Sequence, residues 1–358
     1  MAYSKELTDK IIKMKLDGES SRYIAQVVLG NKSKKSSVND IYNRYLEGLK
    51  ENVEVKPRLR VEPEIANTKP RKQKPNEKLE TQKIYPIVTS EHVESNVTHI
   101  MIPDTQCKGG INMSYLSHIG EYLARKQPAV IVHIGDHADM PSLSSYDKGK
   151  KSAEGKRVFK DIEASIEGMN LLLKPIYDLQ QSQLRKFGEV LYKPKMILTL
   201  GNHEERIMRH VDANPELHGL LSYDNLKYKE FGWEVYDFLE PAIVNGVVYS
   251  HFMANPMTGK PYGGAALNIL KQVGESFCMG HKQCLDVATR FLPASGKQQW
   301  AIIAGAAYPH DEGYKGYTGN KHFRGIVIKH NVINGSFNPM FVDLKYLEDK
   351  YHEPTINN

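Results

Sequence analysis

The stretch KMILTLGNHEERI, residues 195–207, contains the pattern on which the fold prediction depends. An apolar run, MILTL, is followed at once by GNHE (residues 201–204) and then by a segment with helical character. Short apolar runs of this length predict buried β-strands. The polar residues come where the strand would end, and in open α/β sheets ligands and catalytic groups collect at this edge.

Four other apolar runs end in polar residues in the same way. They are THIMIPD, AVIVHIGD, VVYSH and SFCMGH, at residues 98–104, 129–136, 247–251 and 276–281. Near the C-terminus, residues 323–344 combine two strand-like runs with an Asn-Gly pair, which predicts a hairpin. From residue 96 onward we therefore expect an α/β domain.

The residues at these strand ends supply carboxylates, amide oxygens and imidazoles. They are Asp104, Gln106, Asp136, Asp139, Asn202, His203, His251, His281 and Gln283. Mixed oxygen and nitrogen donors suit a pair of divalent ions. Two ions about 3.5–4 Å apart can hold a phosphoryl group and lower the pKa of a bound water. The pattern predicts a dinuclear site with one bridging carboxylate.

The five motifs resemble those of the calcineurin-like metallophosphoesterase superfamily, D-x-H, G-D-x-x-D, G-N-H-[DE], H and G-H-x-H. The resemblance covers about residues 97–285, in motif order. It implies that residues 96–358 form a metallophosphoesterase domain, an αββα sandwich of two sheets. The expected fold class is therefore α/β, with a small all-α domain at the N-terminus.

The resemblance also assigns metal ligands. Asp136 would be the bridging carboxylate, and Asn202, His251 and His281 would complete one metal site. Asp104 would serve the other site.

That second site departs from the family at two positions. Gln106 replaces the histidine of the first motif, and Gln283 replaces the second histidine of G-H-x-H. Oxygen donors favour Mn²⁺, Mg²⁺ or Ca²⁺ over Zn²⁺. We expect two divalent ions, Mn²⁺ favoured with Mg²⁺, Ni²⁺ or Zn²⁺ possible, and weaker binding at this site.

Catalysis would involve a histidine that binds no metal. His203 matches the family histidine suited to protonate the leaving oxygen or to steady the transferring phosphoryl group, and Asp139 would orient it and favour its charged form. The expected activity is hydrolysis of a phosphate ester, with a phosphodiester of nucleic acid or a nucleotide favoured. Two alternatives remain, a phosphomonoesterase (including a protein phosphatase) and a DNA-binding scaffold whose phosphoesterase fold no longer turns over.

Residues 1–50 show helical periodicity three times. Their segment DGESSRYIAQVVLG is similar to resolvase-like helix-turn-helix domains, which implies that a third helix, after a cap near Ser36-Ser37, enters the major groove. Residues 1–50 contain ten Lys or Arg and six Asp or Glu, an excess of positive charge. The expected DNA contacts are Lys32, Lys34, Lys35 and Arg44. A three-helix cap or an oligomerisation bundle is the alternative.

Residues 51–95 contain five prolines and mixed charge, and we expect a flexible linker. No apolar run is long enough to cross a bilayer, and three scattered cysteines make no disulfide framework. These features favour the cytoplasm, without a membrane partner. The combination of domains would suit a phage protein, acting in the host cytoplasm; the oligomeric state stays undetermined.

Two further segments are candidates for the substrate pocket. Residues 145–160 supply Lys148, Lys150, Lys151, Lys156, Arg157 and Lys160, which would favour a polyanion beside the metals or form a solvated loop. Residues 307–323 interleave tyrosines with cations, which suits either stacked bases or ordinary packing.

Overall fold

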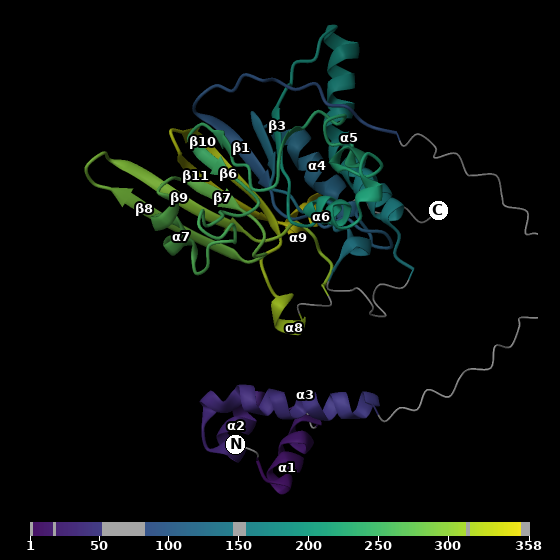
Figure 1. The fold of residues 1–358 in the computed structure, drawn as a ribbon. Coiled ribbons are helices and arrows are strands. Elements are labelled where there is room, and N and C mark those ends of the chain that lie inside the picture. The colour runs from purple at the N-terminus through teal and green to yellow at the C-terminus, as the bar shows by residue number, and fades with distance from the viewer. Residues whose placement is uncertain (1–2, 17–18, 52–82, 146–154, 313–315, 352–358) are drawn as a thin grey trace, which may run out of the picture. The chain divides into compact units, whose positions relative to one another are not determined.

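The computed structural model in Figure 1 describes residues 3–16, 19–51, 83–145, 155–312 and 316–351. The chain divides into two compact units, Met1–Asn76 and Glu77–Asn358. Each unit has its own hydrophobic core and is described separately. No helix among the described residues has both the length and the apolar character needed to cross a membrane.

The N-terminal unit contains three α-helices, as the periodicity predicts. They are α1 (Lys5–Leu16), α2 (Ser21–Leu29) and α3 (Lys35–Glu51), with a 3-10 turn, η1 (Lys32–Lys34), before α3. Their common core consists of Ile11, Ile24, Ala25, Val38 and Ile41. The expected cap at Ser36-Ser37 is wrong, because η1 leads directly into α3 and both serines lie inside its first turn.

The second unit contains two mixed β-sheets. In the described part of the chain, one sheet has six strands in the order β11-β10-β1-β2-β3-β4 and the other has five in the order β5-β6-β7-β9-β8. The first sheet comprises β1 (Val97–Ile102), β2 (Val130–His133), β3 (Lys195–Thr199), β4 (Glu234–Tyr236), β10 (Gly325–Ile333) and β11 (Ser336–Asp343). The second comprises β5 (Ala242–Val244), β6 (Val247–Tyr249), β7 (Phe277–Met279), β8 (Leu285–Leu292) and β9 (Lys297–Ala304). Strands β1 to β4 are parallel, as are β6, β7 and β9.

Alternation along the strands separates the core into layers. In β2, Val130 and Val132 belong to a core shared by both sheets, whereas Ile131 faces the helices. In β7, Cys278 joins the shared core, whereas Phe277 packs with the opposite layer. Because successive side chains of a strand point to opposite faces, these central strands are apolar on both sides. The unit is therefore an α/β sandwich of two sheets with helices outside.

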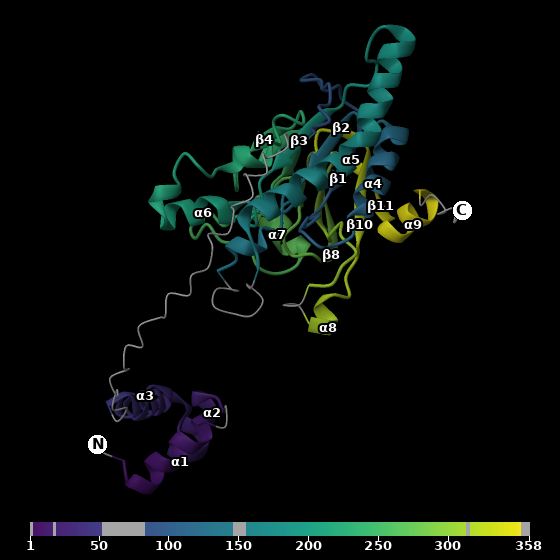
Figure 2. The same cartoon turned by 90° about the vertical axis from the view of Figure 1, so that its right-hand side faces the viewer.

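The helices cover the outer faces of the two sheets (Figures 1 and 2). Helices α4 (Ser114–Lys126), α5 (Val158–Phe187), α6 (Glu205–Ala213) and α9 (Leu344–Tyr351) contribute to the core on the six-stranded sheet. Helix α7 (Ala266–Val273) packs on the five-stranded sheet. Short turns η2 (Pro141–Leu143), η4 (Pro215–Leu217), η5 (Tyr223–Leu226) and α8 (Gly316–Gly319) lie in the connections. The expected hairpin is confirmed, since β10 and β11 pair antiparallel around Asn334-Gly335.

The predicted linker differs from the structure at its C-terminal end. Residues 52–82 lie outside the described residues, but residues 83–95 belong to the second unit and contribute to its core. Ile87 is buried in its core, and its N–H donates to the carbonyl of Phe231. The side chain of Gln180 bonds both backbone groups of Val88. These contacts anchor the segment to the core, so it is not a solvated spacer.

A buried polar cluster lies between the two sheets. His99 Nδ1 is 2.8 Å from the Tyr249 hydroxyl, and His99 Nε2 is 3.0 Å from Asn245 Oδ1. Lys329 is fully buried, with Nζ 4.9 Å from the centre of the Tyr249 ring. Burial and the nearby Lys329 lower the pKa of His99 to about 3. His99 therefore stays neutral in the folded protein under ordinary conditions.

Replacing His99 with glutamine should make stability less sensitive to acid. Between pH 6.5 and 3 the unfolded chain binds a proton at His99 that the folded chain does not, so stability falls as the pH falls. The His99→Gln variant lacks this proton, and its unfolding free energy should fall less steeply, by about 1.4 kcal/mol per pH unit. Urea unfolding at several pH values measures this difference, with the exposed His92→Gln as control. Equal slopes for His99→Gln and wild type would contradict it.

Candidate metal centre

Each of the five motifs follows the carboxyl end of a strand, as predicted. Asp104 comes two residues after β1, Asp136 three residues after β2, and Asn202 three residues after β3. His251 and His281 follow β6 and β7 of the other sheet, each by two residues. The parallel strands of both sheets thus bring these side chains to one edge of the sandwich.

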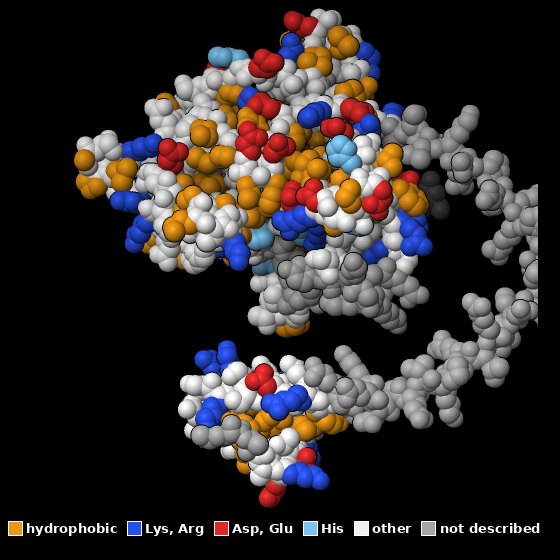
Figure 3. Space-filling model, viewed as in Figure 1, with side chains coloured by type: hydrophobic (Ala, Val, Ile, Leu, Met, Phe, Trp, Pro, Cys, Tyr) orange, Lys and Arg blue, Asp and Glu red, His pale blue; other side chains and the backbone are white. Residues whose placement is uncertain are grey.

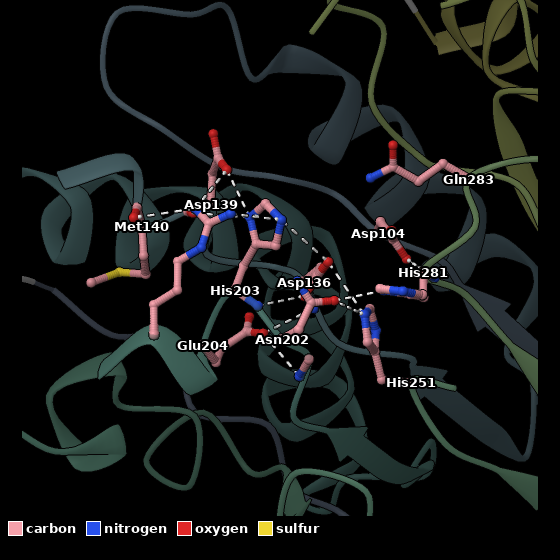
Figure 4. Close-up of polar contacts among 12 residues, drawn as sticks. Asp104, Asp136, Asp139, Met140, Asn202, His203, Glu204, His251, His281 and Gln283 are labelled. Carbon is pink, nitrogen blue, oxygen red and sulfur yellow. Dashed lines mark hydrogen bonds and ion pairs between the residues drawn. The ribbon is translucent and has the colours of Figure 1, made fainter. Parts of the chain in front are cut away.

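Asn202 and Asp136 form the centre of the cluster (Figure 4). The side-chain oxygen of Asn202 lies 2.9 Å from His251 Nε2 and 2.7 Å from His281 Nδ1. One carboxylate oxygen of Asp136 lies 3.3 Å from His251 Nε2. The other nitrogen of His251 donates to the carbonyl of Ile134 at 2.9 Å, which orients the ring. Four side chains from four strand ends therefore meet.

His203 lies on the other side of Asp136. Its Nδ1 is 2.8 Å from a carboxylate oxygen of Asp139, and its Nε2 is 3.7 Å from Asp136. Its backbone N–H also donates to Asp136 at 2.9 Å. The structure thus brings His203 and Asp139 into direct contact, the pairing that the sequence suggested.

Two glycines let the backbone pass close to the carboxylates. A Cβ at Gly201 would lie 2.1 Å from Asp136 Oδ1, and a Cβ at Gly280 would lie 2.3 Å from Asp104 Oδ1. No side chain fits at such distances, so glycine precedes both Asn202 and His281 for a steric reason.

Sequence reasoning assigned no role to Glu204, which is fully buried. Its carboxylate accepts bonds from the backbone N–H groups of Asp136, Ala138 and Gly201 at 2.9–3.0 Å. The Tyr228 hydroxyl donates to the same carboxylate at 3.1 Å. Glu204 therefore joins the loops after β2 and β3. Its place at the fourth position of GNHE was the available signal.

Sequence reasoning missed Lys108, and it left Arg206 as either a phosphate contact or part of a structural ion pair; both cations contact Asp139. Lys108 Nζ lies 3.2 Å from Asp139 and 2.6 Å from Glu312. Arg206 donates to the backbone carbonyl of Asp139 at 2.7 Å, and its Nη2 lies 3.2 Å from His203 Nε2. Lys108 comes two residues after the first motif, but nothing in the sequence pairs it with Glu312.

The electrostatics of the cluster differ from one side chain to the next. Burial alone would lower the pKa of His203, but Asp136 and Asp139 outweigh it and raise that pKa. Burial would likewise lower the pKa of His251, but the nearby Asp136 outweighs it and raises that pKa to about 9. Burial and the charge of His251 lower the pKa of His281 to about 4.

The carboxylates respond in opposite directions. Although burial opposes ionisation of Asp139, its bond to His203 lowers its pKa to about 2. The neighbouring His203 and His251 likewise lower the pKa of Asp136 against the effect of burial. Burial and the charge of Asp136 raise the pKa of Asp104 to about 6.

The expected second site is less complete. One carboxylate oxygen of Asp104 and both side-chain polar atoms of Gln106 are buried without a hydrogen-bond partner. Gln283 instead accepts a bond from the Tyr308 hydroxyl at 2.9 Å. A buried polar atom without a partner usually marks an absent ion or water.

The backbone at this site adopts uncommon conformations. Gln106, Asp136, His281 and Gln283 all have positive φ, from 44° to 63°. Positive φ is energetically unfavourable for residues other than glycine, and residues with this conformation are concentrated at functional sites. Residues proposed for both metal sites share this feature.

The donor spacing around Asn202 and Asp136 suits one of the two expected cations. Metal bonds of about 2.1 Å at right angles place ligand atoms about 3.0 Å apart, and the contacts of Asn202 and Asp136 with the histidines measure 2.7–3.3 Å. Among the described residues, however, no group of three or more His, Cys, Asp or Glu side chains is arranged to hold a metal ion. Here the amide of Asn202 bonds both imidazoles directly, so a cation would have to displace these hydrogen bonds.

The two segments expected as candidates for the substrate pocket, residues 145–160 and 307–323, lie in different environments. Lys156, Arg157 and Lys160 line a cleft that also includes Asp139 and His203, whereas Lys148, Lys150 and Lys151 lie outside the described residues. Tyr308, expected as a base-stacking residue or as ordinary packing, is fully buried and bonds Gln283, which favours packing.

The chain matches no protein-family model, and a search of curated proteins finds no match either. The functional assignment therefore depends on the residues and geometry of the site itself.

Metal titration should reveal two unequal sites. We expect the site of Asn202, His251 and His281 to fill first, and the site of Gln106 and Gln283 to bind more weakly, with Mn²⁺ preferred over Zn²⁺. Calorimetry with each ion measures both affinities. The Gln106→His/Gln283→His variant should tighten the weak site, whereas Asn202→Ala should weaken the first one. Two equivalent tight zinc sites in the wild-type protein would contradict this prediction.

Proposed function

We propose that the second unit is a metal-dependent phosphoesterase with a calcineurin-like fold. The observation that supports it best is the meeting of Asp136, Asn202, His251 and His281 at strand ends of two sheets, with His203 beside them. Carboxylate, amide and imidazole donors together suit divalent cations that act on phosphate.

The proposed site would hold two divalent cations, with Mn²⁺ favoured. Asn202, His251 and His281 would hold one, Asp104 with Gln106 and Gln283 the other, and Asp136 would contact both. When bound, the cations would neutralise the charge of the phosphoryl group and lower the pKa of an attacking water.

His203 is the proposed proton donor. Asp139 accepts from Nδ1 and so directs Nε2 toward Asp136. The two carboxylates raise the pKa of His203, which favours a proton at Nε2 for the leaving oxygen. Lys108 forms an ion pair with Asp139 that offsets its negative charge. Asp139 still accepts the hydrogen bond from His203.

The proposed substrate is a phosphodiester of nucleic acid or a nucleotide, and the N-terminal unit would bind DNA. Lys32, Lys34, Lys35 and Arg44 are exposed on η1 and α3. Figure 3 shows separate lysine and arginine side chains around a hydrophobic strip on the visible face of this unit. A tether between the units would raise the local concentration of substrate. The proposed location is the cytoplasm, that of the host if the protein belongs to a phage.

Removal of the His203 imidazole should separate catalysis from metal binding. His203→Ala should lose about 10²–10⁴ in turnover on an alkyl phosphate ester, because a general acid contributes about this much. Bound metal, measured by mass spectrometry, should not change. The exposed His218→Ala serves as control.

The leaving group provides the decisive comparison. His203→Ala should lose less on a p-nitrophenyl ester, because this leaving group needs no proton. Near-normal turnover of the alkyl ester would exclude His203 as the donor. No turnover by wild type with Mn²⁺, Mg²⁺, Ni²⁺ or Zn²⁺ would favour the scaffold alternative.

Removal of the N-terminal unit should reduce DNA affinity without changing the chemistry. A shortened protein that begins at Glu77 keeps the core contacts of residues 83–95 and should retain its rate on a chromogenic ester. Its affinity for duplex DNA should fall, as should that of full-length Lys32→Ala/Lys34→Ala/Lys35→Ala.

The salt dependence provides an independent measure. The log affinity of the intact protein should decrease with log salt by about 0.9 per phosphate contact. Equal DNA affinity for the intact and shortened proteins would exclude DNA binding by this unit and favour a cap or oligomerisation bundle.

A further inference from the structure

Two clefts of the second unit adjoin at the candidate site. Pro141, Ser144 and Arg206 line both of them. The larger, of about 880 Å³, reaches Asn202 and His281. The smaller, of about 580 Å³, reaches Asp139 and His203 instead. The clefts therefore reach different residues of the cluster.

The larger cleft is cationic, and we name it the Arg209 cleft. The described residues that line it include Arg206, Arg209 and Lys260 but no Asp or Glu. Phe238 and Phe252 also line it, and the guanidinium of Arg209 lies 5.8 Å from the centre of the Phe238 ring. Cations beside aromatic faces are typical of surfaces that bind single-stranded nucleic acid.

The smaller cleft is also cationic, and we name it the Lys160 cleft. Arg157 and Lys160 are exposed in its lining. Of its carboxylates, Asp139 and Glu312 are both paired with Lys108. Its remaining carboxylate, Asp161, accepts a bond from the backbone N–H of Ser142 at 2.8 Å.

Helix α5 adds to the positive charge of the Lys160 cleft. The helix begins at Val158, and the capping residue Arg157 supplies no side-chain hydrogen bond to it. The first N–H groups of a helix carry partial positive charge. This charge and the side chains of Arg157 and Lys160 favour an anion at the same place.

We propose that the two clefts bind a polynucleotide strand on both sides of the scissile phosphodiester. This inference rests on the proposed function. A phosphomonoester has a single substituent and would leave one cleft without a ligand, whereas a phosphodiester within a strand continues in both directions. Hydrolysis forms a bond from phosphorus to a water oxygen and breaks the bond to a sugar oxygen, which leaves with a proton.

Paired substitutions in the full-length protein test each cleft. Arg157→Ala/Lys160→Ala removes two charges from the Lys160 cleft, and Arg209→Ala/Lys260→Ala removes two from the Arg209 cleft. The matched control is Arg185→Ala/Lys186→Ala, at the other end of α5, about 40 Å from Arg157. Figures 1 and 2 show that this end of α5 projects from the unit.

Each double substitution in a cleft should lower kcat/KM on a single strand of about 12 nucleotides by about tenfold or more. Neither should change kcat/KM on bis(p-nitrophenyl) phosphate by more than about twofold, because this ester has no further phosphate for the substituted cations to bind. The control should change neither value. The proposal is overturned if the cleft pairs match the control on the long strand, or if mononucleotides are hydrolysed as efficiently as the strand.

A direct binding measurement distinguishes failure of this inference from failure of the proposed function. If wild type hydrolyses neither substrate with any of the four metals, the proposed function fails. Fluorescence anisotropy of the labelled strand then still tests the clefts, in a Lys32→Ala/Lys34→Ala/Lys35→Ala background that removes the expected N-terminal contacts. Weaker binding by the cleft pairs than by the control supports the clefts as a strand-binding surface, and equal binding overturns it.

Discussion

The buried carboxylate of Glu204 is the constraint on which the candidate site depends. It accepts three backbone N–H bonds and one tyrosine hydroxyl bond inside the protein. A carboxylate removed from water is costly unless donors surround it, so the loops that supply these donors are held to it. Those loops carry Asp136 and Asn202. Their separation sets where His203 and His251 can make contact.

One of the links between the two sheets is a backbone acceptor of the first that orients a histidine of the second. Ile134, just after β2, accepts from His251 Nδ1, so a residue that follows β6 is oriented by a loop of the other sheet. The apolar alternation that packs the sheets together thereby also positions the imidazoles. The strained backbone at Asp136 and His281 is tolerated because the loops around them are fixed by these contacts.

Local pattern was enough to predict the strands that carry the motifs, the C-terminal hairpin and the polar residues at the strand ends, but not β4, β5, β8 or β9. The pairing of Asp139 with His203 came from the family resemblance. Each of the features predicted from local pattern depends on neighbours in sequence or on a repeated motif. The contacts of Lys108 were not predictable in this way, because Glu312 is 204 residues away. Residues 83–95 were mistaken for part of a linker because they have few apolar side chains and their partners, such as Phe231, are distant in sequence. At Gln106 and Gln283, sequence indicated a change of donor chemistry, but only structure distinguishes the unpartnered amide from the one bonded to Tyr308.

The proposed metal ligands come from both sheets, so cation binding would be coupled to the contact between the sheets. Asp104, Asp136 and Asn202 come from one sheet, and His251 and His281 from the other. A cation that contacts both groups binds only the docked sandwich, so its binding free energy adds to the cohesion between the sheets. Removal of the cation by a chelator would weaken the contact between the sheets at this edge before the rest of the core. The cation would thus stabilise the contact between the sheets as well as take part in the chemistry.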